Sequence, residues 1–169
     1  MSQGTVALAA FLDREAAVAA VTAYAGALDA RDWTAYRALL SDQITLDYGA
    51  IGSVVATIAA DEWTARCRAL EGFDATAHRL HNISADIAGD RAVVRCIVDA
   101  AHFIAVDGET LLGDLIGHYT HLLVRDDQGG DGWKITGVTL TVAGYPAGRP
   151  AFDAAFAAAR AKFAERAAP

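Results

Sequence analysis

All five histidines of the chain lie between residues 78 and 121, in a stretch that reads as successive β-strands. They are His78, His81, His102, His118 and His121. Imidazole is the side chain whose ordinary pKa lies closest to neutrality, so several of them on one sheet indicate proton transfer. A carboxylate that could orient one of them, Asp29, stands at the end of an apolar N-terminal segment. The pattern predicts an active site with acid–base chemistry.

The spacing of the histidines does not favour a metal site. His78 and His81 are three residues apart, as are His118 and His121, and on a strand this spacing puts the two rings on opposite faces. The sequence has no HxH, HExxH or Cys/His combination, and no nucleotide-binding or serine-hydrolase motif. We therefore expect no metal and no cofactor.

The composition predicts one globular domain over residues 1–169, since 54% of the residues are hydrophobic and 21% are charged. The net charge of −7, with no run of Lys or Arg, argues against nucleic acid or an anionic membrane as partner. No uncharged stretch approaches the ~20 residues that span a bilayer, and no basic segment at the start suggests a signal peptide. Cys67 and Cys96 form no CxxC motif, which favours a reducing, cytoplasmic setting.

The first half of the chain reads as helices with one strand. Asp13 predicts the N-cap of a helix running to about residue 29, and Asp32 the cap of a second helix to residue 40. Residues 44–48 alternate as in a strand, and a third helix begins near Asp61.

The second half reads as long strands followed by a helix. Turns are expected at Gly89-Asp90, Asp107-Gly108 and Gln128–Gly132, between strands over 78–87, 92–106, 111–125 and 133–142. After Pro146, Phe152, Phe156 and Phe163 share one face of a last helix. The order predicts an α+β domain, with a curved, mixed or antiparallel sheet around the N-terminal helices and a terminal helix closing one end.

Several short motifs resemble one family over nearly the whole chain, from about Arg14 to Phe163. The motifs are Tyr24-Ala-Gly-Ala-Leu-Asp29-Ala-Arg-Asp32-Trp33, Leu46-Asp47-Tyr48, Ala75-Thr-Ala-His78, Ala101-His102-Phe103 and Gly132-Trp133-Lys134-Ile135. In this order and spacing they resemble SnoaL-like proteins of the nuclear transport factor 2-like superfamily. Within it, the chain is most similar to scytalone dehydratase and bile-acid dehydratase-type enzymes. The pattern Phe152-Asp153-x-x-Phe156-x-x-x-Arg160-x-x-Phe163 is similar to the helix that covers the pocket in scytalone dehydratase.

The resemblance implies a cone-shaped domain with a deep apolar cavity between sheet and helices, often assembled as a homodimer or homotrimer. In the dehydratases an aspartate at the end of the first long helix orients a histidine that removes a proton next to a carbonyl. The matching residues are Asp29 and His78. The alternative is structural: Asp29 would cap the following helix, and His78 would be a hydrogen-bonded core residue.

Three further residues are candidates for catalysis: His102 and Tyr48 match polar pocket positions but could also be structural, and Tyr24 could supply a hydroxyl that Leu28 lacks. His102 would protonate a departing hydroxyl or hold it by a hydrogen bond. Tyr48 would polarise the substrate carbonyl. Tyr24 precedes Asp29 by five residues, the spacing of bile-acid dehydratase-type sequences.

The chain also departs from scytalone dehydratase. Leu28 stands where that enzyme has a tyrosine, and His118 and Thr120 stand where it has a serine and an asparagine. We expect these three residues to line the pocket, closed by Phe152 and Phe156. Tyr119 and His121 would then face outward, and His81 would point away from His78. These changes argue against scytalone itself as substrate.

The sequence therefore predicts a cofactor-independent lyase that removes water from a hydroxylated cyclic ketone, an apolar polyketide- or steroid-like compound. An isomerase or a polyketide cyclase would use the same base without expelling water. A non-catalytic domain that binds a small apolar ligand is the alternative outside catalysis.

Overall fold

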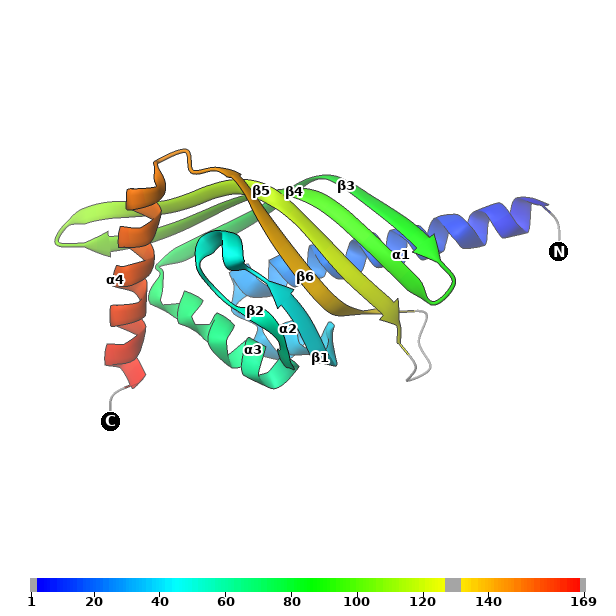
Figure 1. Ribbon diagram of the computed structural model, residues 1–169, viewed down its shortest axis with the longest axis horizontal. Helices are drawn as coiled ribbons and strands as arrows, with labels where there is room; N and C mark the ends of the chain where they lie inside the picture. Colours follow the sequence, from blue (N-terminus) through cyan, green and yellow to red (C-terminus); the bar gives the residue numbers. More distant parts are fainter. Residues whose placement is uncertain (1–2, 127–131, 168–169) are drawn as a thin grey trace.

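The computed structural model describes residues 3–126 and 132–167, which form an α+β domain as predicted (Figure 1). In chain order its elements are α1 (Gln3–Ala30), α2 (Trp33–Ala38), β1 (Leu40–Asp47), η1 (Gly49–Ile51), β2 (Val55–Ala59), α3 (Ala60–Cys67), η2 (Arg68–Gly72), β3 (Ala75–Ala88), β4 (Arg91–Val106), β5 (Glu109–Arg125), β6 (Trp133–Gly144) and α4 (Arg149–Ala167). One six-stranded sheet has the order β2-β1-β6-β5-β4-β3. Its strands pair antiparallel except for β1 and β6, so the sheet is mixed.

The sheet curves around helices α1, α2 and α3, and α4 crosses its far end (Figure 1). Alternate side chains of the strands form the core with one face of α1, as the period of two requires. Fully buried examples are Val21 on α1, Ile44 on β1, Val98 on β4 and Ile135 on β6. This arrangement leaves the end near α4 as the place where a cavity can open.

Helix α1 begins ten residues earlier than predicted, and the expected cap at Asp13 is wrong. Residues 4–12 are rich in alanine and leucine, which favour helix, so the chain enters the helix at Gln3. The Asp13 carboxylate instead pairs with Arg125 on β5, and its carbonyl accepts a hydrogen bond from Trp133. The first turns of α1 project beyond the sheet (Figure 1), where Phe11 and Leu12 are exposed.

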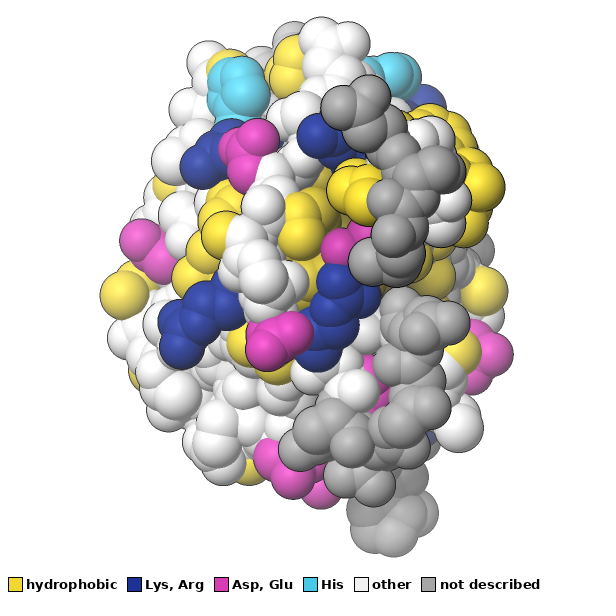
Figure 2. All heavy atoms as spheres, turned by 90° about the vertical axis from the view of Figure 1, so that its right-hand side faces the viewer, with side chains coloured by type: hydrophobic (Ala, Val, Ile, Leu, Met, Phe, Trp, Pro, Cys, Tyr) yellow, Lys and Arg dark blue, Asp and Glu magenta, His cyan; other side chains and the backbone are white. Residues whose placement is uncertain are grey.

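The end of the molecule from which α1 projects carries cationic and acidic side chains next to one another, with apolar side chains between them (Figure 2). No helix in the described part of the chain has the length and apolarity needed to cross a membrane.

Other local predictions hold with small changes. The Asp32 side chain caps α2 by accepting a hydrogen bond from the Ala35 amide at 2.9 Å. The four long strands extend a little further than expected, and the turns at Gly89 and Gly108 use positive φ values of 60° and 85°. Strand β2 was not predicted. The expected turn at Gln128–Gly132 falls mostly outside the described residues.

Helix α4 packs directly against the backbone of two glycines, which have no side chain to keep it at a distance. A Cβ atom on Gly72, at the end of η2, would lie 2.0 Å from the carbonyl oxygen of Ala159. A Cβ atom on Gly113, in β5, would lie 3.0 Å from the Cβ of Ala155. The approach at Gly72 requires glycine and the contact at Gly113 is tight, and both place the middle of α4 against the end of the sheet.

Candidate active site

A cavity of about 200 Å³ lies between α1, α3, the sheet and α4. Polar side chains line it from Tyr24, Tyr48, Ser53, Arg66, Cys67, His78, His102 and Tyr119. Most of the remaining wall is apolar or aromatic, from Leu28, Ile51, Trp63, Leu70, Ala100, Leu115, Leu140, Phe152 and Phe156. Since a cavity of about 150 Å³ holds benzene, this volume suits one or two fused rings.

Asp29 and His78 contact each other at the wall of this cavity. The Nδ1 atom of His78 lies 2.7 Å from Oδ1 of Asp29, and the amide of His78 donates to Oδ2 at 2.7 Å. The Thr76 hydroxyl donates to Oδ1 at 2.9 Å. A carboxylate in the last turn of a helix meets the negative end of the helix dipole, so these donors offset an unfavourable position. Asp29 therefore holds His78 and does not cap α2.

The charge of Asp29 follows from these contacts. Partial burial acts to raise the pKa of the carboxyl, but the hydrogen bonds from His78 and Thr76 outweigh it and hold the pKa below its ordinary value. The ionised carboxylate accepts a hydrogen bond from Nδ1–H of His78. The ring proton therefore stays on Nδ1, and Nε2 carries the lone pair. With its side chain only 7% exposed, His78 offers this Nε2 atom as a base in an apolar site.

His102 meets the ring of His78 edge-on, with ring centroids 5.1 Å apart and planes at 88°. Its Nδ1–H donates to the carbonyl oxygen of Gly113 at 2.8 Å. Burial, with the nearby His78, lowers the pKa of His102 to about 3, so the ring is neutral at pH 7. A neutral ring whose proton is on Nδ1 has none on Nε2 to donate. Of the two roles expected for His102, holding a hydroxyl fits this geometry and protonating it does not.

Two phenols form the other polar part of the cavity. The hydroxyls of Tyr24 and Tyr48 are 3.0 Å apart. Burial raises the pKa of Tyr24 to about 12 and that of Tyr48 well above its ordinary value, so both are neutral donors at pH 7. One of the two hydroxyls donates to the other, and Tyr36, Trp63 and Tyr119 lie within hydrogen-bonding reach of the pair.

The predicted orientation of β5 is wrong. His118 is exposed and Thr120 is only half-buried on the outer face, while Tyr119 lines the cavity and His121 is fully buried behind it. The period of two correctly predicts which residues share a face, but a shift of one residue in the alignment exchanges the faces. His81 is exposed, on the side away from His78.

Among the described residues, neither ring nitrogen of His121 has a hydrogen-bond partner. Its ring packs edge-on against Tyr24, at 5.3 Å between centroids, and against Tyr119, at 5.2 Å. Burial lowers its pKa to about 3, so it is neutral at pH 7. It lies behind the phenols of the cavity without lining it.

Other predicted pocket residues lie where expected. Leu28, Phe152 and Phe156 line the cavity, and the two phenylalanine rings stack at 4.3 Å between centroids. Thr76 was missed, although it stands two residues before His78 and the period of a strand places both on one face. Trp63 was also missed, because nothing near it in the sequence marks it as a wall residue.

No three His, Cys, Asp or Glu side chains gather as metal ligands within residues 3–126 and 132–167.

Comparison with protein families gives one match: the profile of the SnoaL-like domain matches residues 9–139. No curated protein matches the chain. Among solved structures, the Kfla4162 protein from Kribbella flavida is similar, with 26% identity and a TM-score of 0.74 over 89% of this chain and 99% of that one.

Two further structures show the shared fold at lower identity. A candidate scytalone dehydratase from Novosphingobium aromaticivorans has 24% identity and a TM-score of 0.65 over 76% of this chain and 83% of that one. The CaMKII hub of S. rosetta has 17% identity and a TM-score of 0.60 over 77% of this chain and 96% of that one. The fold is nuclear transport factor 2-like, as the motifs predicted.

Proposed function

Since the chain belongs to the SnoaL-like domain family, we propose that it is a cofactor-independent dehydratase that removes water from a hydroxylated cyclic ketone. The observation that carries the proposal is the Asp29–His78 pair, held by three hydrogen bonds at the wall of an apolar cavity. The opposing phenols of Tyr24 and Tyr48 support it, because proton removal beside a carbonyl needs a base and an oxyanion donor.

In the proposed reaction, Nε2 of His78 removes the proton next to the substrate carbonyl. Asp29 stabilises the imidazolium that forms, and a hydroxyl of the Tyr24–Tyr48 pair donates a hydrogen bond to the enolate oxygen. His102 accepts a hydrogen bond from the β-hydroxyl and holds it near His78. The enolate then expels the hydroxyl while His78 returns its proton to it, so one water leaves and His78 is neutral again.

The volume of the cavity limits the size of substrate that can bind. About 200 Å³ suits a compound whose reacting part has one or two rings, and a four-ring steroid would have to leave most of its skeleton outside. Of the two apolar classes expected from the sequence, a small polyketide-like ring fits better.

One observation favours a second candidate. Since His102 has no proton on Nε2, His78 alone both takes and returns a proton, and returning it to a second carbon would make the protein an isomerase.

The test is mass spectrometry of products from small cyclic β-hydroxy ketones, with the Asp29→Asn and His78→Gln variants beside the native protein. We expect loss of one water, slower by about 10²–10⁴-fold in each variant, because the base is lost or misoriented. His81→Gln, which removes the exposed imidazole of the same strand, is the matched control and should keep full activity.

Other outcomes would decide against dehydration. A product of unchanged mass that both variants fail to form would favour the isomerase. Full activity in Asp29→Asn and His78→Gln would remove the proposed base. Ligand retention by all proteins without turnover would favour a binding domain.

We also propose that the protein assembles as a homodimer or homotrimer through the outer face of β5. Ile116 and Leu122 are 40% and 46% exposed there, on the same face as His118. Large apolar side chains on a broad sheet face favour contact with another sheet.

A further inference from the structure

A second hollow, of about 390 Å³, adjoins the mouth of the cavity. The two spaces share part of their walls: the stacked rings of Phe152 and Phe156, together with Ile51 and Ser53, contribute to both. A ligand in the cavity therefore has an adjoining groove into which a substituent can extend past these rings. We call this second hollow the outer groove.

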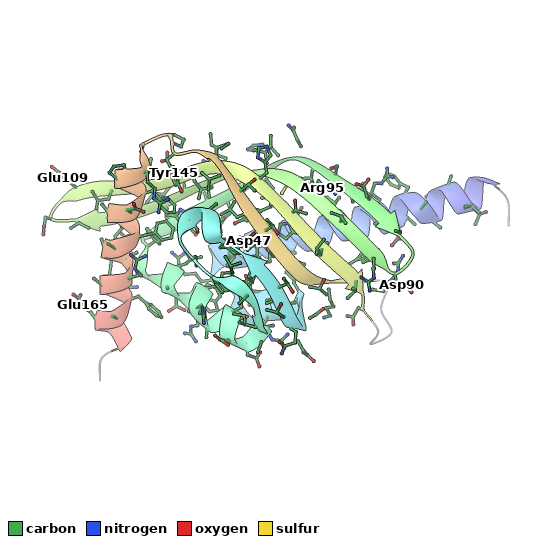
Figure 3. All side chains as sticks on the ribbon, viewed as in Figure 1. Asp47, Asp90, Arg95, Glu109, Tyr145 and Glu165 are labelled. Carbon is green, nitrogen blue, oxygen red and sulfur yellow. The ribbon has the colours of Figure 1, made fainter. Side chains whose placement is uncertain are left out.

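The outer groove contains more positive than negative charge. Arg149 and Asp153 lie one turn apart on α4, Arg160 lies two turns further along the helix, and all three line the groove. Arg149 already has two partners: it donates to Asp153 at 2.8 Å and to the Tyr145 hydroxyl at 3.0 Å. Tyr145 lies just before the start of α4 (Figure 3).

Arg160 differs from Arg149. Within residues 3–126 and 132–167 its guanidinium has no ion pair or hydrogen bond, and Asp153, the groove's one carboxylate, is taken by Arg149. Arg160 is exposed, so its guanidinium is accessible in the groove and can pair with an anionic group of a ligand.

We propose that the outer groove binds a carboxylate carried by the ligand whose ring occupies the cavity. This deepens the proposed function, on whose ligand cavity it rests: the substrate class becomes cyclic ketones with a carboxylate-bearing side chain. Guanidinium matches the planar carboxylate in a bidentate geometry, which an ammonium would not. The side chain between ring and carboxylate must be slender, because it passes the rings of Phe152 and Phe156.

The test is calorimetric binding of two probes, 3-(2-naphthyl)propanoic acid and its primary amide, at neutral pH. The acid should bind the native protein on the order of fivefold more tightly than the amide, the range expected for a solvent-accessible ion pair. This preference should shrink as ionic strength rises, since salt screens accessible charges.

Variants of the chain test which residue causes the preference for the acid over the amide. Arg160→Gln should bind acid and amide equally, and Arg160→Lys should recover part of the preference. Arg91→Gln is the matched control, because Arg91 is an exposed arginine at the start of β4, outside both the cavity and the outer groove, and it should behave as native.

The outcomes separate this proposal from the dehydratase. Equal binding of acid and amide by the native protein would overturn it, as would an unchanged preference in Arg160→Gln or no binding of either probe at millimolar concentration. Asp29→Asn should retain the acid preference while losing turnover. An acid preference without water loss from any ketone would leave the groove assignment standing and overturn the dehydratase. Water loss from neutral ketones, with no preference for the acid probe, would support the dehydratase and overturn the groove assignment.

Discussion

At the scale of single residues, two buried imidazoles make folding sensitive to acid. His102 and His121 have pKa values of about 3 in the folded protein, against about 6.5 in an unfolded chain. Between these values the unfolded chain binds protons that the folded protein does not, so stability falls as the pH falls below 6.5. Asp29 acts in a lower range: its depressed pKa stabilises the fold above about pH 4 and this contribution is lost below it.

We predict that His121→Leu flattens the pH dependence of stability. Lowering the pH from 7 to 5 should reduce the free energy of unfolding by about 2 kcal/mol for each buried histidine. The variant removes one of these two histidines. Since neither ring nitrogen of His121 has a partner in the part of the chain that the structure describes, the substitution removes no hydrogen bond there. Urea unfolding at both pH values measures the difference. His81→Leu, at an exposed position, is the control, and an unchanged slope in His121→Leu would contradict the prediction.

The sequence predicted some site residues and misplaced others for a physical reason. Asp29 and His78 could be paired because a helix end and a strand are recognisable elements and the family motif joins them. Which face of β5 points inward could not be predicted, because both faces carry large apolar residues. The inner face has Leu115 and Leu123, and the outer face has Ile116 and Leu122. With similar faces, the period of a strand does not tell which one is buried.

At the scale of elements, the packing of α4 against the rest of the domain depends on Gly72. We predict that Gly72→Ala lowers the free energy of unfolding by about 1–3 kcal/mol, because the new methyl group would collide with the Ala159 carbonyl. Gly26→Ala is the matched control: Gly26 lies within α1 with no atom near its Cβ position, so alanine should stabilise by about 0.5–1 kcal/mol. Urea unfolding would show the opposite signs, and equal effects of the two substitutions would contradict the assigned contact.

Among the elements, the long strands were the easiest to predict and the chain's irregular parts the hardest. Strands β3 to β6 are long and, at two junctions, separated by Gly/Asp turns. Strand β2 has only five residues, Val55–Ala59, and exists because it pairs with β1, a contact that local sequence does not encode. The early start of α1 was missed because Asp13 resembles a cap but is used by Arg125.

At the scale of the whole molecule, the outer face of β5 gives a test of assembly. We predict a mass of two or three times the 17.7 kDa chain in light scattering after size exclusion, and the 17.7 kDa monomer for Leu122→Glu, because a buried carboxylate would oppose the sheet contact. Val55→Glu, an exposed apolar position on edge strand β2, is the control. A native monomer, or an unchanged assembly in Leu122→Glu, would exclude this face as the interface.

The glycine contacts beneath α4 also have a kinetic consequence. With its middle resting on backbone at Gly72 and Gly113, this helix cannot slide or swing without breaking both contacts. The side chain of Phe156 is half-buried at the mouth and packs against the rings of Phe73, His102 and Phe152. We therefore expect small molecules to pass between cavity and solvent when this ring rotates, without movement of α4. The rate of exchange would then be set by how readily one aromatic ring leaves its three neighbours.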